Sequence, residues 1–454
     1  MYNVGSAWHS VAAWQTTLGV WMKFLRETAL LALTAFLLLF LPACGNQFRP
    51  VANPIVSPGG QPQDSHYAWV VNSNPSGGQG STTEIDVSGD SNLAVNSMGV
   101  GSIAAAFPFN SLALYVANNG DDTVSEYLPT LAGAVTTISL LPGSHPVALS
   151  SAQNTAMYVV NSGANSACPN SGSISTISTS TLAVSNTTCL VFTLDGTVVY
   201  GTNPLALAQS PADFFIYILS QNNGGSVFVF SPSGPEITGA ITPQHGGLGQ
   251  NPVSATASLD GNWIFVVTQG DGSGPGTLDI ISAGSTTVAG SVSLGVQPTF
   301  SMIDPNLNRL YVANTGDNTV SVFDTTNVNP SGSPAIPLLA TVKVGTTPIG
   351  VAALPNGSLF YVANSGSDDV TVVSANSFSP LTTVALPTGA NPVWIASEPS
   401  SSKIYVADNG TSETTIIQTV DNTITLNMPA PQQVSGCTSP PPCALQQPVM
   451  IVTR

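Results

Sequence analysis

The sequence predicts an all-β protein, a β-propeller of about eight four-stranded blades. Three observations support this fold class. A short motif, an aromatic residue followed by Val, Ala and Asn, recurs with a period in the forties. No helical periodicity of useful length follows residue 50. Gly and Pro number 42 and 35 among 454 residues, yet 43% of the residues are hydrophobic, which is enough for a large core.

The recurring motif marks one strand of each blade. Its clearest copies are Leu114–Asn118, Leu310–Asn314 and Phe360–Asn364, and it is weaker near Tyr217 and Phe265. Between 43 and 59 residues separate successive aromatic positions, a spacing typical of propeller blades. The eight aromatic positions are Trp69, Tyr115, Tyr158, Tyr217, Phe265, Tyr311, Tyr361 and Tyr405.

One repeat divides into four expected strands. Pro348–Ala353 is short and rich in small residues, which suits the crowded centre of a ring. Phe360–Asn364 and Val370–Val373 are dominated by Tyr and Val, which fit a pleated and half-buried sheet. Leu381–Leu386 supplies the fourth strand, and Gly, Ser, Asn and Asp in the intervening segments predict turns.

The two ends of the chain predict how the ring closes. The first aromatic position, Trp69, has no short proline strand before it, whereas Gln447–Thr453 begins a repeat that has no aromatic strand after it. We therefore expect Gln447–Thr453 to be the innermost strand of the first blade, beside Trp69–Asn72, because closure removes open sheet edges. This count gives eight blades, with seven as the alternative.

The pattern Tyr-Val-Ala-Asn-x-Gly-Asp-Asn-Thr-Val-Ser-Val is clearest in Tyr311–Phe323 and Tyr115–Tyr127. It resembles the YVTN family of β-propellers, and the resemblance covers most of Tyr67–Arg454, with departures in residues 160–260. The resemblance implies a surface-layer or periplasmic protein. Because lactonase-type propellers are related to this family, it also implies lactonase activity if the protein is an enzyme. The repeat itself specifies a fold and not a reaction.

The N-terminus predicts export. Lys23 and Arg26 precede the apolar run Thr28–Leu41, which is shorter than the roughly 20 residues of a membrane-spanning helix. Leu41–Cys44 resembles the lipobox of bacterial lipoproteins, in which the cysteine is acylated. The alternative is ordinary secretion with Cys44 free. The expected organisation is a mis-assigned leader at 1–21, a signal peptide at 22–43, a lipidated cysteine and flexible tether at 44–65, and one propeller at 66–454.

Five cysteines fit this organisation. An odd cysteine in an exported protein needs an explanation, and acylation of Cys44 provides one. Two pairs that are local in sequence remain, and neither has the spacing of a zinc or redox motif. We expect disulfides between Cys168 and Cys189 and between Cys437 and Cys443.

The charge pattern limits the partners. Without Lys23, Arg26 and Glu27, the mature chain has five basic and 22 acidic residues, a net charge of −17. Few cations argue against nucleic acid, whose phosphates require Lys and Arg. We expect a monomer that contacts the membrane through its N-terminal lipid, with a glycan or peptide as ligand and with no cofactor and no bound metal.

Candidate catalytic groups are sparse. His66, His145 and His245 each lie alone in their segments, so scattered surface or turn histidines are favoured over a metal site. The acidic pairs Asp121–Asp122 and Asp368–Asp369 lie beside glycines at expected hairpin turns. The turn interpretation is therefore favoured over acid–base chemistry or calcium binding. No catalytic residue is assigned.

One set of residues is a candidate ligand site. Each lies directly before the proline that begins an expected innermost strand, so the set should gather at one mouth of the central channel. Neutral groups there could hold a polar ligand, although a turn role before proline is favoured. The function expected is a non-catalytic binding or scaffold propeller at the bacterial cell envelope, with a lactonase-type hydrolase of a neutral substrate as the alternative. The candidate ligand ring is His145, Asn203, Asn251, Gln297, Thr347, Asn391 and Gln447.

Overall fold

A computed structural model describes residues 67–108, 111–129, 134–151, 155–210, 215–221, 224–304, 306–333, 335–432 and 445–454. These residues form β-strands joined by turns. Among them, no helix combines the length and hydropathy needed to cross a membrane. The expected lipid site Cys44, the signal peptide, the tether and the pair Cys437 and Cys443 lie outside the described residues.

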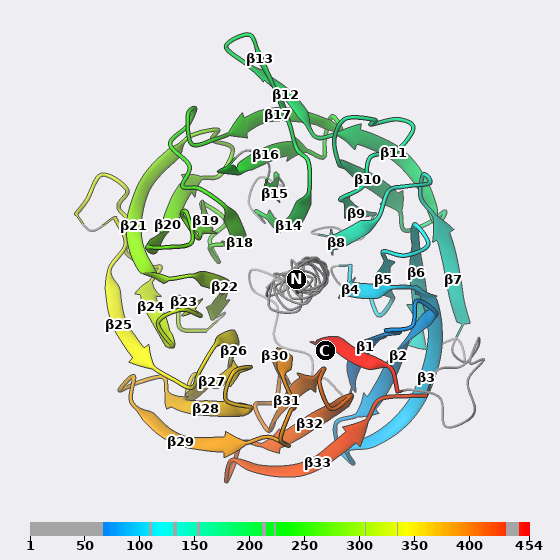
Figure 1. Cartoon of the computed structure of the whole chain (residues 1–454), viewed down its shortest axis with the longest axis vertical. Helices are drawn as coiled ribbons and strands as arrows, with labels where there is room; N and C mark the ends of the chain where they lie inside the picture. The colour runs from blue at the N-terminus through cyan, green and yellow to red at the C-terminus, as the bar shows by residue number, and fades with distance from the viewer. Residues whose placement is uncertain are drawn as a thin grey trace, which may run out of the picture. The chain divides into compact units, whose positions relative to one another are not determined.

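The strands form eight four-stranded antiparallel sheets that are arranged in a ring (Figure 1). The sheets are blades of a β-propeller, which confirms the predicted fold class and the count of eight rather than seven. Blade 1 combines β1, β2 and β3 with the C-terminal strand β34. Blades 2 to 8 are consecutive groups of four strands, and among the described residues only the two-stranded sheet β12–β13 stands outside this scheme.

The innermost strands are short, and each contacts its neighbours on both sides around the ring. Many begin with proline, whose missing N–H is harmless at the first residue of a strand. In the order of blades 1 to 8 they are β34 (Gln447–Thr453), β4 (Ser102–Ala106), β8 (Pro146–Ser150), β14 (Pro204–Gln209), β18 (Pro252–Ala257), β22 (Pro298–Asp304), β26 (Pro348–Ala353) and β30 (Pro392–Ser397).

The second strands carry the aromatic motif, and their aromatic side chains are buried. Large aromatic residues suit this position because each fills the space between adjacent blades. The second strands are β1 (Tyr67–Ser73), β5 (Leu114–Asn118), β9 (Ala156–Asn161), β15 (Ile216–Ser220), β19 (Trp263–Thr268), β23 (Arg309–Asn314), β27 (Leu359–Asn364) and β31 (Lys403–Asp408).

The third strands are largely buried between their two neighbours. They are β2 (Gln79–Asp86), β6 (Thr123–Leu128), β10 (Ser173–Ser178), β16 (Ser226–Ser231), β20 (Pro275–Ser282), β24 (Thr319–Asp324), β28 (Asp369–Ser374) and β32 (Glu413–Gln418). The outermost strands are more exposed, which explains why they carry many Thr and Ser residues. They are β3 (Ser91–Val100), β7 (Ala134–Ser139), β11 (Ala183–Cys189), β17 (Glu236–Ile241), β21 (Val288–Val296), β25 (Leu338–Lys343), β29 (Pro380–Ala385) and β33 (Thr423–Pro429).

The C-terminal strand closes the ring as predicted. β34 pairs antiparallel with β1, so that Trp69 is opposite Val452 and Asn72 is opposite Pro448. Figure 1 shows the red C-terminal strand inside the blade that the blue N-terminal strands begin. On the other side of this strand, the indole Nε1 of Trp394 in blade 8 donates a hydrogen bond to the carbonyl of Ile451 at 2.9 Å.

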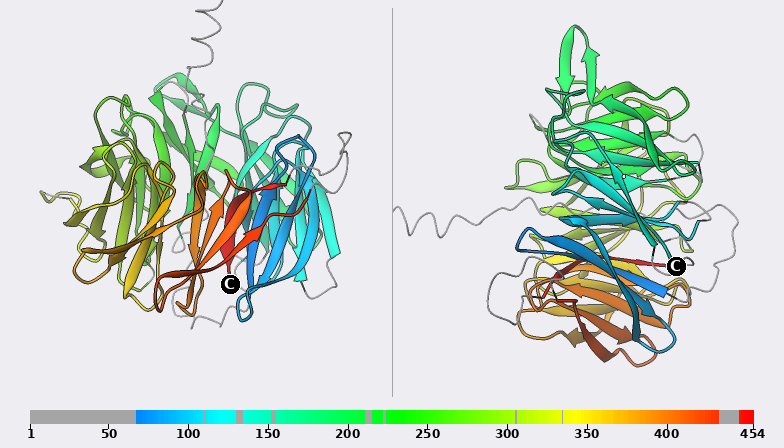
Figure 2. Two further views of the ribbon diagram at one scale, coloured as in Figure 1. Left: turned by 60° about the horizontal axis from the view of Figure 1, so that its bottom comes forward. Right: turned by 90° about the vertical axis from the view of Figure 1, so that its right-hand side faces the viewer.

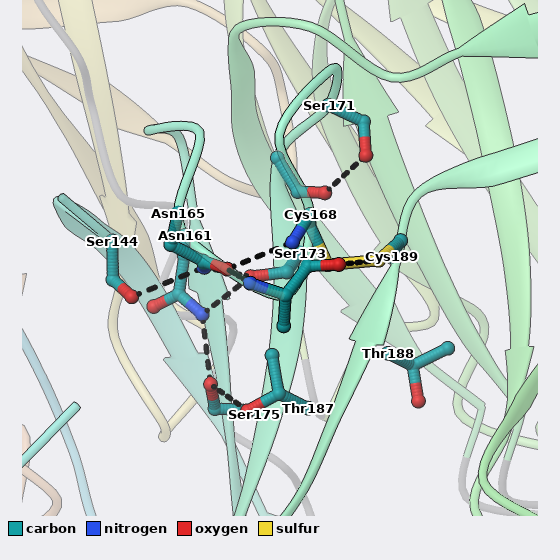
Figure 3. The surroundings of a disulfide bond; sticks show 12 residues. Ser144, Asn161, Asn165, Cys168, Ser171, Ser173, Ser175, Thr187, Thr188 and Cys189 are labelled. Atoms are coloured by element: carbon teal, nitrogen blue, oxygen red, sulfur yellow. Dashed lines mark hydrogen bonds between the residues drawn. A yellow bond between two sulfur atoms is a disulfide. The ribbon is translucent and has the colours of Figure 1, made fainter. Parts of the chain in front are cut away.

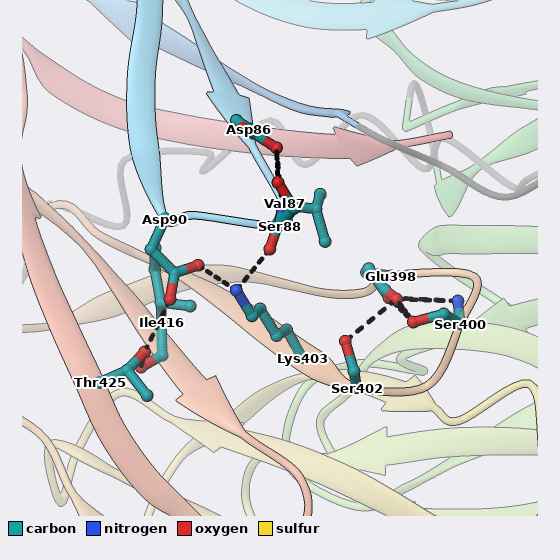
Figure 4. A network of polar contacts seen from close by, with 10 residues as sticks. All are labelled: Asp86, Val87, Ser88, Asp90, Glu398, Ser400, Ser402, Lys403, Ile416 and Thr425. Atoms are coloured by element: carbon teal, nitrogen blue, oxygen red, sulfur yellow. Dashed lines mark hydrogen bonds and ion pairs between the residues drawn. The ribbon is translucent and has the colours of Figure 1, made fainter.

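A buried ion pair joins the last blade to the first (Figure 4). Lys403 of β31 is 8% exposed, and its Nζ lies 2.5 Å from a carboxylate oxygen of Asp90, in the turn between β2 and β3. The same ammonium group donates to the carbonyl of Val87. Side views show blades 1 and 8 next to each other around the C-terminal strand (Figure 2). The junction therefore combines strand pairing with a largely buried ion pair.

Between blades 3 and 4, an additional hairpin accounts for the longest spacing between aromatic positions. It consists of β12 (Val191–Leu194) and β13 (Thr197–Tyr200) and projects outward from the ring (Figure 1). The predicted disulfide between Cys168 and Cys189 lies just before this hairpin (Figure 3) and is confirmed, with Cα atoms 5.3 Å apart. It ties the loop between β9 and β10 to the end of β11.

Candidate binding face

The innermost strands all begin at the same end of the ring, which we call the Pro face. This follows from strand register, because the first or second residue of each innermost strand is opposite the last or second-last residue of the second strand. The opposed pairs, from blade 1 to blade 8, are Pro448–Asn72, Ser102–Asn118, Pro146–Asn161, Pro204–Ser220, Pro252–Thr268, Pro298–Asn314, Pro348–Asn364 and Pro392–Asp408.

Six members of the candidate ligand ring share a left-handed backbone, with φ between 42° and 57°. This conformation is unfavourable for residues other than Gly, and least so for Asn and Asp. Blade 2 has Gly101 at the equivalent position, with φ of 69°. Gln447 differs, because it is already paired within β34, opposite Ser73. The six left-handed residues are His145, Asn203, Asn251, Gln297, Thr347 and Asn391.

In five of the six residues, the left-handed turn lets the carbonyl accept a hydrogen bond from the hairpin between the second and third strands of the same blade. His145 O accepts from Ser162 N at 3.0 Å, and Thr347 O accepts from Ser365 N at 2.9 Å. The same contact is made from Gln221 to Asn203, from Gln269 to Asn251 and from Thr315 to Gln297. These bonds compensate for the strain of the turn, so the residue type before proline has a structural role.

Acidic and amide side chains of the hairpins hold the next blade. Asp122, in the blade 2 hairpin, accepts from the backbone N–H groups of Gly143 and His145, both at 2.7 Å. Asp368 accepts in the same way from Gly389 and Asn391 at 2.8 Å. These contacts support the turn interpretation for Asp122 and Asp368 and show that each turn also bridges two blades, whereas Asp369 is the first residue of β28.

Several side chains of the candidate ring contact hairpin backbones. His145 Nδ1 lies 2.9 Å from the carbonyl oxygen of Asn119, and Asn251 Nδ2 donates to Gly270 O at 2.7 Å. For Asn203, Thr347 and Asn391, the contacts to neighbouring loops are made by the main chain. The structure therefore places six predicted residues at equivalent positions around one face, where the polar side chains of these three are half-buried or exposed.

A row of buried amides lies beneath this face, at the last position of the aromatic motif. Asn118 is fully buried, and its Nδ2 donates to the hydroxyls of Thr123 and Ser125, both at 2.9 Å. Asn161 makes the corresponding contacts to Ser173 and Ser175. Most copies of the aromatic motif have Asn at this position, but the sequence analysis assigned it no role. The row consists of Asn72, Asn118, Asn161, Asn314 and Asn364, with Asp408 in blade 8.

Asp408 replaces the amide of this row by a carboxyl group. It is fully buried, and burial raises its pKa from 3.8 to about 7, with the carboxylates of Glu413 and Asp368 adding to the shift. Thr415 Oγ1 lies within hydrogen-bond distance of both Asp408 Oδ2 and Asn427 Oδ1. A hydroxyl carries one hydrogen, so a protonated Asp408 satisfies both contacts by donating to Thr415, which then donates to Asn427.

The sequence analysis also assigned no role to a glycine that recurs before the innermost strands at this face. Seven of the eight innermost strands have Gly three residues before their first residue, as in Gly295 before Pro298. A Cβ atom on Gly295 would lie 2.5 Å from Asp317 Oδ2 and 2.7 Å from Asn314 Cγ. Gly99 and Gly345 lie equally close to Asn118 and Asn364, so at these three positions the approach of the backbone to the buried amide row requires glycine. The spacing Gly-x-x-Pro could have revealed it.

The two histidines that the structure describes, His145 and His245, are not brought together. His145 belongs to the Pro face, 3.7 Å from one carboxylate oxygen of Asp122. His245 lies in the loop after β17, with its Nε2 3.1 Å from Asp195 Oδ2 at the tip of the additional hairpin. His66 lies outside the described residues. Within the described ranges, no cluster of three or more His, Cys, Asp or Glu side chains is arranged to hold a metal ion.

Comparisons with known proteins show the fold alone. No family model matches the sequence, so membership of the YVTN family remains a prediction, and no curated protein matches it either. Among solved structures, dihydro-heme d1 dehydrogenase NirN in complex with DHE is similar to this chain. It has 11% identity and a TM-score of 0.64, and the match covers 89% of this chain and 78% of that one. Apo AztD from Citrobacter koseri is similar at 12% identity and a TM-score of 0.54, with coverages of 85% and 98%. Both are β-propeller proteins.

Proposed function

We propose that this protein is a non-catalytic binding or scaffold propeller of the bacterial cell envelope, which offers the Pro face to a neutral polar ligand, a glycan or a peptide. The observation that supports it most is the equivalent placement of six neutral, hydrogen-bonding residues around one end of a closed ring. Their backbones are held by hairpin contacts, so a ligand would meet side chains that need little ordering.

The disulfide supports an extracytoplasmic location. Cys168 and Cys189 form an intramolecular bridge, and such bridges are typical of proteins that fold in oxidising, extracytoplasmic environments. The carboxylates nearest the ring, Asp122 and Asp368, accept backbone N–H groups on both oxygens. These contacts favour a supporting role over acid–base chemistry, and the lactonase-type alternative from the sequence stays a prediction.

Glycine substitutions test the Pro face. Asn203→Gly and Asn391→Gly remove the side-chain amide while glycine keeps the left-handed backbone without strain. With full-length protein in detergent, we expect a ligand found on glycan and peptide arrays to bind each variant about tenfold more weakly, which corresponds to one lost hydrogen bond. The matched control is Asn308→Gly, a left-handed Asn at the opposite end of blade 6. Arrays without any bound glycan or peptide, or binding that both variants retain, would contradict the proposed function.

Membrane attachment needs a separate test. Leu41–Cys44 supports acylation of Cys44, and stable anchoring then depends on acyl chains. We expect Cys44→Ser to move the protein from the membrane fraction to the soluble fraction. Labelled fatty acid should be incorporated into the wild-type protein and not into the variant, and an unlabelled wild-type protein would exclude the lipid anchor.

A further inference from the structure

A pocket of about 190 Å³ lies outside blade 4, between the additional hairpin and the ring. Phe192 and Leu194 of β12 form one wall, and Ala240 of β17 belongs to the wall on the ring side. His245, from the loop after β17, and Thr286, from the loop between β20 and β21, also line it. We call this site the hairpin pocket. Besides β17, its walls come from the additional hairpin and from two loops.

The hairpin wall is fixed at its base. Gly201 N donates to Leu190 O at 2.7 Å, which closes the hairpin where it leaves the ring. The disulfide from Cys189 to Cys168 holds the residue just before that base (Figure 3). Thr188 Oγ1 also donates to Pro235 O, in the turn before β17, at 2.9 Å. The disulfide therefore ties the base of the hairpin to blade 3, and the hydrogen bond from Thr188 ties the preceding strand β11 to the turn before β17 of blade 4.

The other walls are fixed as well. Gly284 N, in the loop between β20 and β21, donates to the hydroxyl of the buried aromatic residue Tyr217 at 2.7 Å. A Cβ atom on Gly239 would lie 2.2 Å from Thr286 Cγ2, so glycine is required for this loop to lie against β17. His245 is held by a turn in which its N–H donates to Thr242 Oγ1 at 3.0 Å. The pocket is thus formed before any ligand binds, which lowers the entropic cost of binding.

The pocket has a neutral and amphipathic lining. Its lining contains no Lys or Arg, and its one titratable lining group, His245, is paired with Asp195 at the hairpin tip. Phe192, Leu194 and Ala240 offer apolar surface, whereas the hydroxyls of Thr286 and Thr287 offer hydrogen-bonding groups. An anionic ligand would find no Lys or Arg here, and a purely apolar one would form no hydrogen bond with the hydroxyl of Thr286.

We propose that the hairpin pocket binds a single neutral sugar ring, such as the terminal pyranose of a glycan. A pyranose matches the lining because one face exposes C–H groups and its edge carries hydroxyls. The volume is below the roughly 300–1,000 Å³ of pockets for drug-sized ligands, which limits the occupant to one ring. This proposal rests on the proposed function, since it names a ligand class and a second location for the same binding role.

Saturation-transfer NMR with a panel of neutral methyl pyranosides tests the proposal on the full-length protein. We expect at least one pyranoside to bind, and Phe192→Ala and His245→Ala to weaken that binding at least tenfold. The matched control is Val198→Ala on the same hairpin, because Val198 is 44% exposed and does not line the pocket. Equal weakening by Val198→Ala, or no bound pyranoside, would overturn the proposal.

A second variant distinguishes loss of the pocket from loss of the fold. Replacing Val191–Tyr200 by Asn-Gly joins Leu190 to Gly201, which already share a hydrogen bond, with a favoured two-residue turn. The melting temperature and the disulfide report whether the ring persists. Loss of pyranoside binding in a folded variant supports the hairpin pocket. If that variant keeps its ligand while Asn391→Gly loses it, the hairpin pocket is excluded and the proposed function stands.

Discussion

At the scale of single residues, Asp408 has a carboxyl group at the position where other blades have the amide of Asn. Its folded pKa of about 7 lies above the ordinary value of 3.8, so folding favours the protonated form. The cost of ionising the buried Asp408 carboxyl is absent below about pH 4. It grows as the pH rises from about 4 to about 7 and is then constant, so the folded state loses up to about 4 kcal/mol. We expect Asp408→Asn to raise the melting temperature at pH 8 and to leave it nearly unchanged at pH 4.

The converse substitution is the control. Asn161 occupies the same position in blade 3 and donates to Ser173 and Ser175. Asn161→Asp should introduce the pH dependence that Asp408→Asn removes, because it places a second buried carboxyl group in the amide row. Melting curves of both variants between pH 4 and pH 8 check this, and parallel pH profiles for all three proteins would contradict a protonated Asp408.

At the scale of elements, the hairpins between second and third strands hold consecutive blades together. Asp122→Ala should leave the N–H groups of Gly143 and His145 without their acceptors, at a cost of about 1–3 kcal/mol. Asp122→Asn keeps one acceptor oxygen and should cost less. Blade 6 already has an amide at the equivalent position, since Asn318 Oδ1 accepts a hydrogen bond from Thr347 N at 2.8 Å. Urea denaturation measures both variants, and equal losses would show that the contact depends on charge.

The disulfide acts on one element as well. Its bridge spans 21 residues, and the Cys168→Ser, Cys189→Ser double variant should lose about 3 kcal/mol through the greater freedom of the unfolded chain. The hairpin after Cys189 should become more susceptible to proteolysis, because its base loses a covalent support. Limited proteolysis with mass spectrometry would detect cleavage within Val191–Tyr200, and an unchanged cleavage pattern would show that the polar contacts alone hold the hairpin.

At the scale of the whole molecule, closure depends on one strand. Deleting residues 446–454 removes β34 and leaves β1 and both neighbouring innermost strands without their partner. We expect aggregation or a sharply lower melting temperature rather than a local defect, because open edges weaken the entire ring. Lys403 and Asp90 are both retained in this variant, but we expect that one ion pair cannot replace the lost strand. A truncated protein that stays monomeric with an unchanged melting temperature would contradict this role of β34.

The buried carboxyl groups predict an acidic optimum for stability. Burial raises the pKa of Glu126, Asp279, Asp304 and Glu398 as well as Asp408. The stability of the folded protein should therefore fall as the pH rises from about 4 toward 7. Asp260 and Asp324 have lowered pKa values, so their protonation below about pH 4 should destabilise the folded protein as well. We expect the highest melting temperature near pH 4–5, and a maximum above pH 7 would exclude this balance.

Much of the fold was predictable because each blade is local in sequence. The four strands around Tyr361 are linked by short turns, so their residue pattern identifies them without knowledge of the other blades. The hairpin pocket could not be predicted, since Phe192 and Thr286 are separated by almost a hundred residues and neither belongs to a motif. The candidate ring was predictable as a set of positions, but its left-handed backbone was not.

The sequence by itself predicted a ring of about eight blades, the pairing of Cys168 with Cys189 and the closing strand Gln447–Thr453. A regular period and an unpaired half-repeat at each end favour a ring in which the last strand completes the first blade, because closure removes open sheet edges. Only the tertiary structure decided what the polar residues do. Whether Asp122 caps a neighbouring blade or Asp408 retains its proton depends on which distant groups surround each carboxyl, and packing between blades determines those surroundings.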